Sequence, residues 1–82
     1  MGQLRNDKIL LGIALVLKEL RDLKGVSQED VYNETNIHIG RIESSNSNLT
    51  ISTLAELLKY FNIRISDFFV KVESKEKEFT KK

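Results

Sequence analysis

Apolar residues recur every three or four positions along most of this chain, and residues that favour helix ends stand between the periodic segments. Asp7 is placed to cap a helix that runs to about Lys24. Gly25 follows at the position where a left-handed residue commonly ends a helix. The apolar face of this segment consists of Ile9, Ile13, Val16, Leu17, Leu20 and Leu23. The pattern therefore predicts a long amphipathic helix at the start of the chain.

Three further segments repeat this combination of caps and periodicity. Ser27 can cap a short helix to about Glu34, and Asp30 three residues later gives an imperfect capping box. Thr50 can cap another helix, which Asn62 can end in the left-handed conformation. The apolar stripe of that helix is Ile51, Leu54, Leu57, Leu58 and Phe61. A last short helix is predicted from Ile65, Phe68, Phe69 and Val72.

The stretch "TNIHIGRIE", residues 35–43, fits two structures. Ile37 and Ile39 alternate with polar neighbours, as in a half-buried strand, whereas Ile39 and Ile42 are three apart, as on a helix. Helices are predicted on both sides, and no other segment reads as a strand that could pair with it. A lone strand would leave its backbone groups unsatisfied. The stretch is therefore predicted to be a short helix that follows a turn at Asn36.

The length of the chain limits the architecture to one small domain. Eighty-two residues bury only about 60% of the surface of the unfolded chain, which is too little for a deep catalytic cavity. We expect a compact all-α domain of five helices over residues 7–72. Residues 1–6 are expected to be a flexible lead-in, and the charged residues 73–82, "ESKEKEFTKK", a disordered tail.

Several functional classes lack the residues that they need. The chain has no cysteine, its single histidine has no partner for metal binding, and its four glycines do not form a phosphate-binding loop. No nucleophile–base pair is recognisable. The most apolar stretch, residues 9–17, is about half as long as a membrane helix. We therefore expect no enzymatic activity, no cofactor, no metal and no membrane association.

Three stretches, "LRDLKGVSQEDV" (20–31), "IGRIE" (39–43) and "TISTLAELLKYFNIRISDFF" (50–69), resemble the Xre/Cro family of phage-repressor-like helix-turn-helix DNA-binding domains. The resemblance covers about residues 9–70. It implies a prokaryotic, cytoplasmic transcriptional regulator that binds double-stranded DNA as a homodimer through about residues 27–45. The same fold also serves as an antitoxin or a protein-interaction module, so a protein partner is the alternative.

The resemblance also assigns roles to individual residues. Arg41 is expected to read a base, whereas Gln28, Asn46, Ser47 and Asn48 are expected to contact mainly phosphate. Arg21 is expected to form a partly buried ion pair with Glu43. The full set of expected DNA-binding residues is Ser27, Gln28, His38, Gly40, Arg41, Ser44, Asn46, Ser47 and Asn48. A surplus of apolar residues on the terminal helices predicts the dimer interface. Its expected members are Leu10, Leu11, Leu15, Phe68 and Phe69.

Two features depart from the family pattern. Tyr32 stands where the family has a small residue, so its ring must either widen the crossing of two helices or point outward. About three residues are also missing between Ile37 and Ile39, which is nearly one turn of the recognition helix. Arg41 is moreover the only arginine or lysine among residues 27–48, against four carboxylates. Weak binding per monomer is expected, because phosphate neutralisation normally dominates affinity for DNA.

Overall fold

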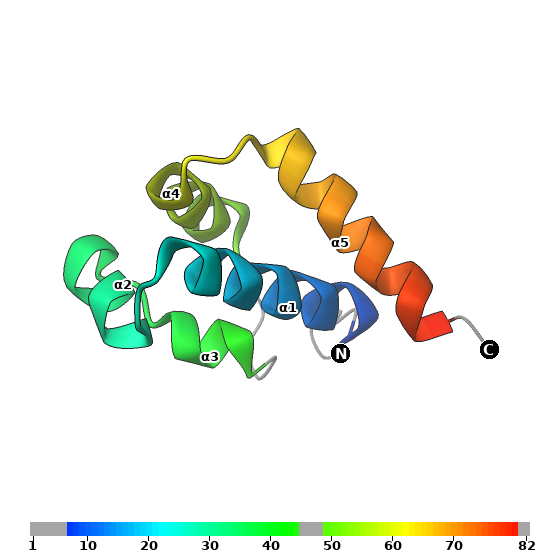
Figure 1. Cartoon of the computed structure of the whole chain (residues 1–82), viewed down its shortest axis with the longest axis horizontal. Helices are drawn as coiled ribbons and strands as arrows, with labels where there is room; N and C mark the ends of the chain where they lie inside the picture. The colour runs from blue at the N-terminus through cyan, green and yellow to red at the C-terminus, as the bar shows by residue number, and fades with distance from the viewer. Residues whose placement is uncertain (1–6, 45–48, 81–82) are drawn as a thin grey trace, which may run out of the picture.

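The computed structural model describes residues 7–44 and 49–80, and these residues form five α-helices without a strand (Figure 1). In chain order they are α1 (Asp7–Lys24), α2 (Gln28–Thr35), α3 (Ile39–Glu43), α4 (Ile51–Phe61) and α5 (Ile65–Thr80). The predicted all-α, five-helix architecture is confirmed, including the helix in the ambiguous stretch. The predictions for residues 1–6, Asn46, Ser47, Asn48 and the last two residues lie outside the described ranges.

Helices α1, α2 and α4 each end at a residue with positive φ. These residues are Gly25 (φ 75°), Asn36 (φ 62°) and Asn62 (φ 57°). Glycine and asparagine adopt this left-handed conformation more readily than other residues do, so they allow the chain to turn sharply after a helix. The three positions are the ones at which the sequence predicted that helices stop.

The starts of α2 and α4 are fixed by hydroxyl caps. The Ser27 hydroxyl accepts a hydrogen bond from the Asp30 backbone N–H (3.0 Å), and the Asp30 carboxylate accepts one from the Ser27 backbone N–H (2.9 Å). The hydrogen bond from the Ser27 backbone N–H and, to a smaller extent, the Ser27 hydroxyl beside the carboxylate lower the pKa of Asp30, because both favour the ionised form. The Thr50 hydroxyl accepts from the Thr53 backbone N–H at 3.1 Å. The predicted capping box is therefore complete.

The core lies between α1 and the other four helices. Val16, Leu17, Val31, Ile39, Leu57 and Phe68 are among its fully covered side chains. Three residues of the predicted apolar stripes lie outside the core instead: Leu23, at 82% exposed, Ile51 and Ile65. Each stands within two residues of a helix end, where the neighbouring helices no longer cover the stripe.

Two of the residues predicted to form a dimer interface are buried within the single chain. Leu10 is buried and Phe68 has no exposed surface within the single chain. Gly12 explains why α5 comes so close to α1. A Cβ atom at Gly12 would lie 3.1 Å from Val72 Cγ1, so only glycine accommodates Val72 without displacement. The close crossing lets α5 place Phe68 in the core.

The last helix is longer than the sequence predicts. α5 continues through residues 73–80, where a disordered tail was expected, and it crosses α1 obliquely in Figure 1. Lys75 forms an ion pair with Glu19 of α1. Glu73 and Lys77, four residues apart, have the spacing and order that stabilise an exposed helix. Charged residues thus extend the helix by contacts that hydrophobic periodicity does not report.

None of the helices in the described ranges has the length and apolar character required to cross a membrane.

Candidate nucleic-acid interface

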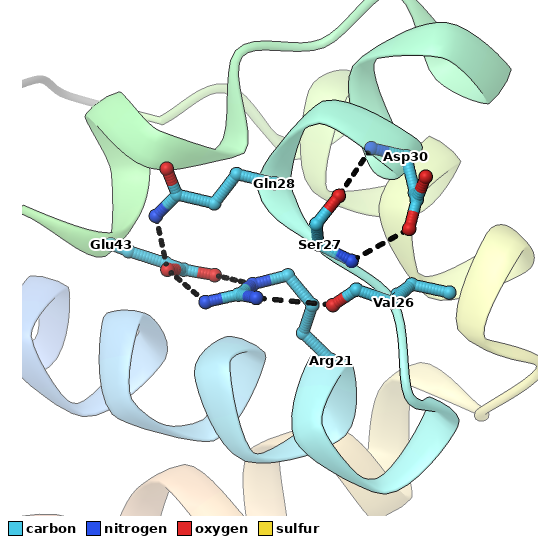
Figure 2. Close-up of polar contacts among 6 residues, drawn as sticks. All are labelled: Arg21, Val26, Ser27, Gln28, Asp30 and Glu43. Atoms are coloured by element: carbon cyan, nitrogen blue, oxygen red, sulfur yellow. Dashed lines mark hydrogen bonds and ion pairs between the residues drawn. The ribbon is translucent and has the colours of Figure 1, made fainter.

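Arg21 of α1 and Glu43 of α3 form an ion pair that is nearly buried (Figure 2). Arg21 Nε donates to Glu43 Oε2 at 2.8 Å, and Arg21 Nη2 donates to Glu43 Oε1 at 3.1 Å. The two side chains are only 13% and 7% exposed, respectively. Arg21 Nη1 also donates to the Val26 carbonyl at 3.1 Å, and bonding to Glu43 raises the pKa of Arg21. The expected pair therefore joins α1, the loop before α2, and α3.

Gln28 extends this network to the first turn of α2. Its Nε2 donates to Glu43 Oε1 at 2.8 Å, so the Glu43 carboxylate accepts three hydrogen bonds (Figure 2). Gly40 permits the approach, because a Cβ atom there would lie 2.9 Å from Gln28 Oε1. The bond to Glu43 leaves the second amide hydrogen of Gln28 available for a ligand. Gln28 therefore has a structural role in addition to the predicted contact with DNA.

Arg41 and Ser44 lie on the exposed side of α3 and at its end. The Ser44 hydroxyl donates to the Arg41 carbonyl at 2.8 Å, and the Ser44 backbone N–H donates to the Gly40 carbonyl at 3.1 Å. Within the described ranges, the Arg41 guanidinium has neither a hydrogen bond nor an ion pair. Glu43, the carboxylate nearest to Arg41 in the sequence, is occupied by Arg21 and Gln28. Arg41 is thus a long cationic side chain that can reach outward.

Lys24 is a basic residue close in the sequence to the start of α2. Lys24 lies 5.1 Å from the centre of the Tyr60 ring and is held there by a cation–π contact. Burial and, to a smaller extent, the charges of Glu34 and Asp30 raise the pKa of Tyr60, so the acidic side of α2 lies near α4. Lys24, the last residue of α1, therefore lies beside Tyr60 of α4, where the acidic side of α2 is also near.

A shallow hollow separates α2 from α3. Gln28, Glu29 and Tyr32 form one wall, and residues 38–41 form the other. The Tyr32 and His38 rings stack across it with centres 4.4 Å apart and planes inclined by 26°. Tyr32 is 39% exposed, so its ring points outward rather than widening the crossing of the helices. The sequence left both orientations of Tyr32 open and did not predict that it meets His38.

The structure thus brings together most of the expected contact residues that it describes. Ser27 and Gln28 begin α2, while His38, Gly40, Arg41 and Ser44 belong to α3 or border it. Asn46, Ser47 and Asn48 lie outside the described residues. Among the residues that are described, no group of three or more His, Asp or Glu side chains is arranged to hold a metal ion.

The succession of α2, a turn at Asn36, and α3 is the geometry of a helix-turn-helix. A model of the helix-turn-helix family matches residues 17–68, which is more than half of the chain and includes this pair of helices. Neither a curated protein nor a solved structure matches the chain significantly. The family match and the geometry agree, and the chain belongs to the Xre/Cro-like helix-turn-helix family.

Proposed function

We propose that the protein is a transcriptional regulator that binds specific sequences of double-stranded DNA, in the cytoplasm of a prokaryotic cell. The observation that carries this proposal is the exposed guanidinium of Arg41 on α3, which has no partner among residues 7–44 and 49–80. The Arg21–Glu43 pair fixes α3 against α1, so Arg41 projects from a rigid support. An arginine in the major groove can donate two hydrogen bonds to O6 and N7 of guanine, which is the commonest specific contact to a base.

The start of α2 would contact the phosphate backbone. The first backbone N–H groups of a helix have no partner within it, and the helix dipole attracts an anion there. The Ser27 hydroxyl hydrogen and the second amide hydrogen of Gln28 can add donors on the same side. Ser44, Asn46, Ser47 and Asn48 would contact phosphate beyond the end of α3. These contacts would fix the position of the protein on DNA without selecting a sequence.

Replacement of Arg41 by alanine should abolish base preference at one position of each half-site. A bidentate arginine–guanine contact discriminates by about 1–3 kcal/mol, and α3 supplies no second long cationic side chain. Gln28→Ala, in contrast, should weaken binding to all DNA sequences about equally. The measurement is selection of bound sequences from a random duplex pool at a stated salt concentration, because affinity depends steeply on salt.

Two outcomes of this selection would count against the proposal. Enrichment of no sequence by the wild-type protein would remove the case for a sequence-specific regulator. An Arg41→Ala variant with the wild-type preference would show that α3 does not read bases through this residue. A thermal unfolding curve for each variant serves as the control, because Arg41 is exposed and its replacement should leave the midpoint unchanged.

We further propose that the protein binds DNA as a homodimer, through exposed apolar residues of α1 and α5. Leu11 is exposed and Leu15 half-buried, four residues apart on one side of α1, and Val70 is exposed on α5 beside the half-buried Phe69. A dimer adds the contacts of two half-sites. This compensates for the four carboxylates that surround Arg41 in the sequence.

The Leu11→Lys variant should shift the protein from dimer to monomer. Burying an unpaired ammonium group in an apolar interface is unfavourable. Leu23→Lys is the matched control, since Leu23 is also exposed but lies at the far end of α1. Sedimentation equilibrium at tens of micromolar distinguishes the two states. A wild-type protein that sediments only as a monomer, or equal effects of both substitutions, would contradict an interface at Leu11.

A second candidate function is that of an antitoxin or another protein-interaction module. The observation in its favour is the acidic character of α2, which carries Glu29, Asp30 and Glu34 but no lysine or arginine. Anionic side chains repel phosphate and suit a basic protein partner. The same selection experiment separates the regulator from a module that binds only proteins, because such a module would enrich no DNA sequence.

A further inference from the structure

The Tyr32–His38 stack joins two elements whose backbones run in different directions. Tyr32 belongs to the last turn of α2, and His38 immediately precedes α3. Their ring centres are 4.4 Å apart. Stacked aromatic pairs favour such an offset, nearly parallel arrangement, so the contact restricts how each ring can turn.

The two stacked rings lie at the surface and not in the core. Val31 and Ile39, the immediate neighbours of Tyr32 and His38 in the sequence, are the fully buried residues at these positions. Both rings of the stack instead remain partly open to solvent on the side of the hollow between α2 and α3. Their arrangement therefore has a consequence for what the hollow can bind.

His38 lacks other constraints within the described residues. It occupies the N-cap position of α3, but its side chain makes no capping hydrogen bond. Neither imidazole nitrogen has a hydrogen-bond partner in that part of the chain. The contact that orients the ring is the stack on Tyr32. Both nitrogens are thus left to a ligand, while one face of the ring is held by Tyr32.

The lining of the hollow favours the edge of a base over a phosphate group. Glu29 contributes a carboxylate, Arg41 a guanidinium and His38 an imidazole, while Gln28 stands at the edge of the hollow next to the start of α2. A phosphate oxygen only accepts hydrogen bonds and would be repelled by Glu29. The edge of a base pair is uncharged and presents donors and acceptors side by side in the major groove. Such a mixed lining therefore matches a base edge.

We propose that His38 contacts a base edge next to the one read by Arg41, and that Tyr32 is the positioning residue that orients the His38 imidazole. The inference rests on the proposed DNA-binding function and adds to it a specificity determinant from α2. α3 has only five residues, Ile39–Glu43, so few of its side chains can reach bases. The stacked pair supplies a second reading group just before this short helix begins.

The test compares four variants in the selection of bound duplex sequences. His38→Ala should reduce discrimination by about tenfold at one base position, which differs from the position affected by Arg41→Ala. Tyr32→Leu, which keeps apolar bulk but lacks a ring, should reduce discrimination at the same position as His38→Ala. Tyr32→Phe, which can still stack, should retain the wild-type preference. The Tyr32→Leu/His38→Ala double variant should be no worse than His38→Ala, because Tyr32 acts through His38.

Each of the remaining outcomes overturns a different statement. If Tyr32→Leu leaves every position unchanged, or if Tyr32→Phe is as defective as Tyr32→Leu, stacking does not position His38. If His38→Ala weakens binding to all DNA sequences equally, His38 contacts phosphate and the inference is wrong, while the proposed function stands. If the wild-type protein enriches no sequence, both fail together. A thermal midpoint for Tyr32→Leu close to that of Tyr32→Phe excludes unfolding as the cause.

Discussion

Replacement of Phe68 by alanine should lower the free energy of unfolding by about 3–5 kcal/mol. Phe68 has no exposed surface and belongs to the buried core cluster, and its ring meets the Phe69 ring edge-on with centres 5.2 Å apart. Its removal leaves a cavity that the neighbouring side chains can fill only in part. A domain of this size has a stability near the low end of about 5–15 kcal/mol. The variant should therefore be largely unfolded at moderate temperature.

The same substitution separates a core residue from an interface residue. If Phe68 mainly stabilised a dimer, the loss would depend on protein concentration, because association stabilises the folded state by mass action. A core residue gives the same loss at every concentration. Urea unfolding at two concentrations a hundredfold apart makes this comparison. A loss that disappears in the dilute sample would contradict the core assignment.

Two further variants keep this test informative if Phe68→Ala does not fold. Phe68→Leu keeps most of the volume and should lower stability only by about 1 kcal/mol. Phe69→Ala makes the same chemical change at a half-buried neighbour and should lower stability less than Phe68→Ala. An equal loss for Phe68→Ala and Phe69→Ala would show that burial in the single chain does not distinguish the two rings.

Features that depend on neighbours in the sequence were predictable. Ser27, Asn36, Thr50 and Asn62 act on the backbone within one turn of a helix, so their residue types are enough to place helix ends. The Arg21–Glu43 pair joins distant positions, and it was expected only because the family resemblance implied it.

Features that depend on how two helices cross were not predictable from periodicity. An apolar stripe does not reveal where its covering helix stops, which is why Leu23 and Ile51 are exposed. It also does not reveal that Gly12 lets α5 approach α1 closely enough to bury Phe68. The Tyr32–His38 contact depends on the turn between α2 and α3. No local rule predicts such a contact between two rings six positions apart.

Replacement of Glu43 by alanine should lower the free energy of unfolding by about 3 kcal/mol, near the lower end of the range for breaking a buried ion pair. The Arg21 guanidinium, only 13% exposed, would lose both hydrogen bonds to the carboxylate and most of its compensation for desolvation. Gln28 would lose its bond to α3 as well. Chemical denaturation followed by circular dichroism measures the change. Glu19→Ala, which breaks the more exposed pair with Lys75, is the matched control and should have little effect.

A double substitution tests whether the loss comes from the stranded charge. Arg21→Met combined with Glu43→Leu removes both ions and retains apolar bulk, so it should be much more stable than Glu43→Ala. If the double variant is as unstable as the sum of the single variants, Arg21 and Glu43 contribute independently, and the geometry of the pair is not what stabilises the fold.

The Glu43→Ala variant should also lose DNA binding more than its global stability predicts. α3 spans only five residues, far fewer than an isolated helix needs, so tertiary contacts must hold it in place. Ile39 and Ile42 anchor one side of α3, while the bonds to Arg21 and Gln28 anchor its end. Without Glu43, the backbone amides of α3 should exchange with solvent faster than those of α1 under conditions where the protein is folded. Equal exchange protection in wild type and variant would show that the two isoleucines suffice to order α3, and that the ion pair does not position Arg41 for DNA.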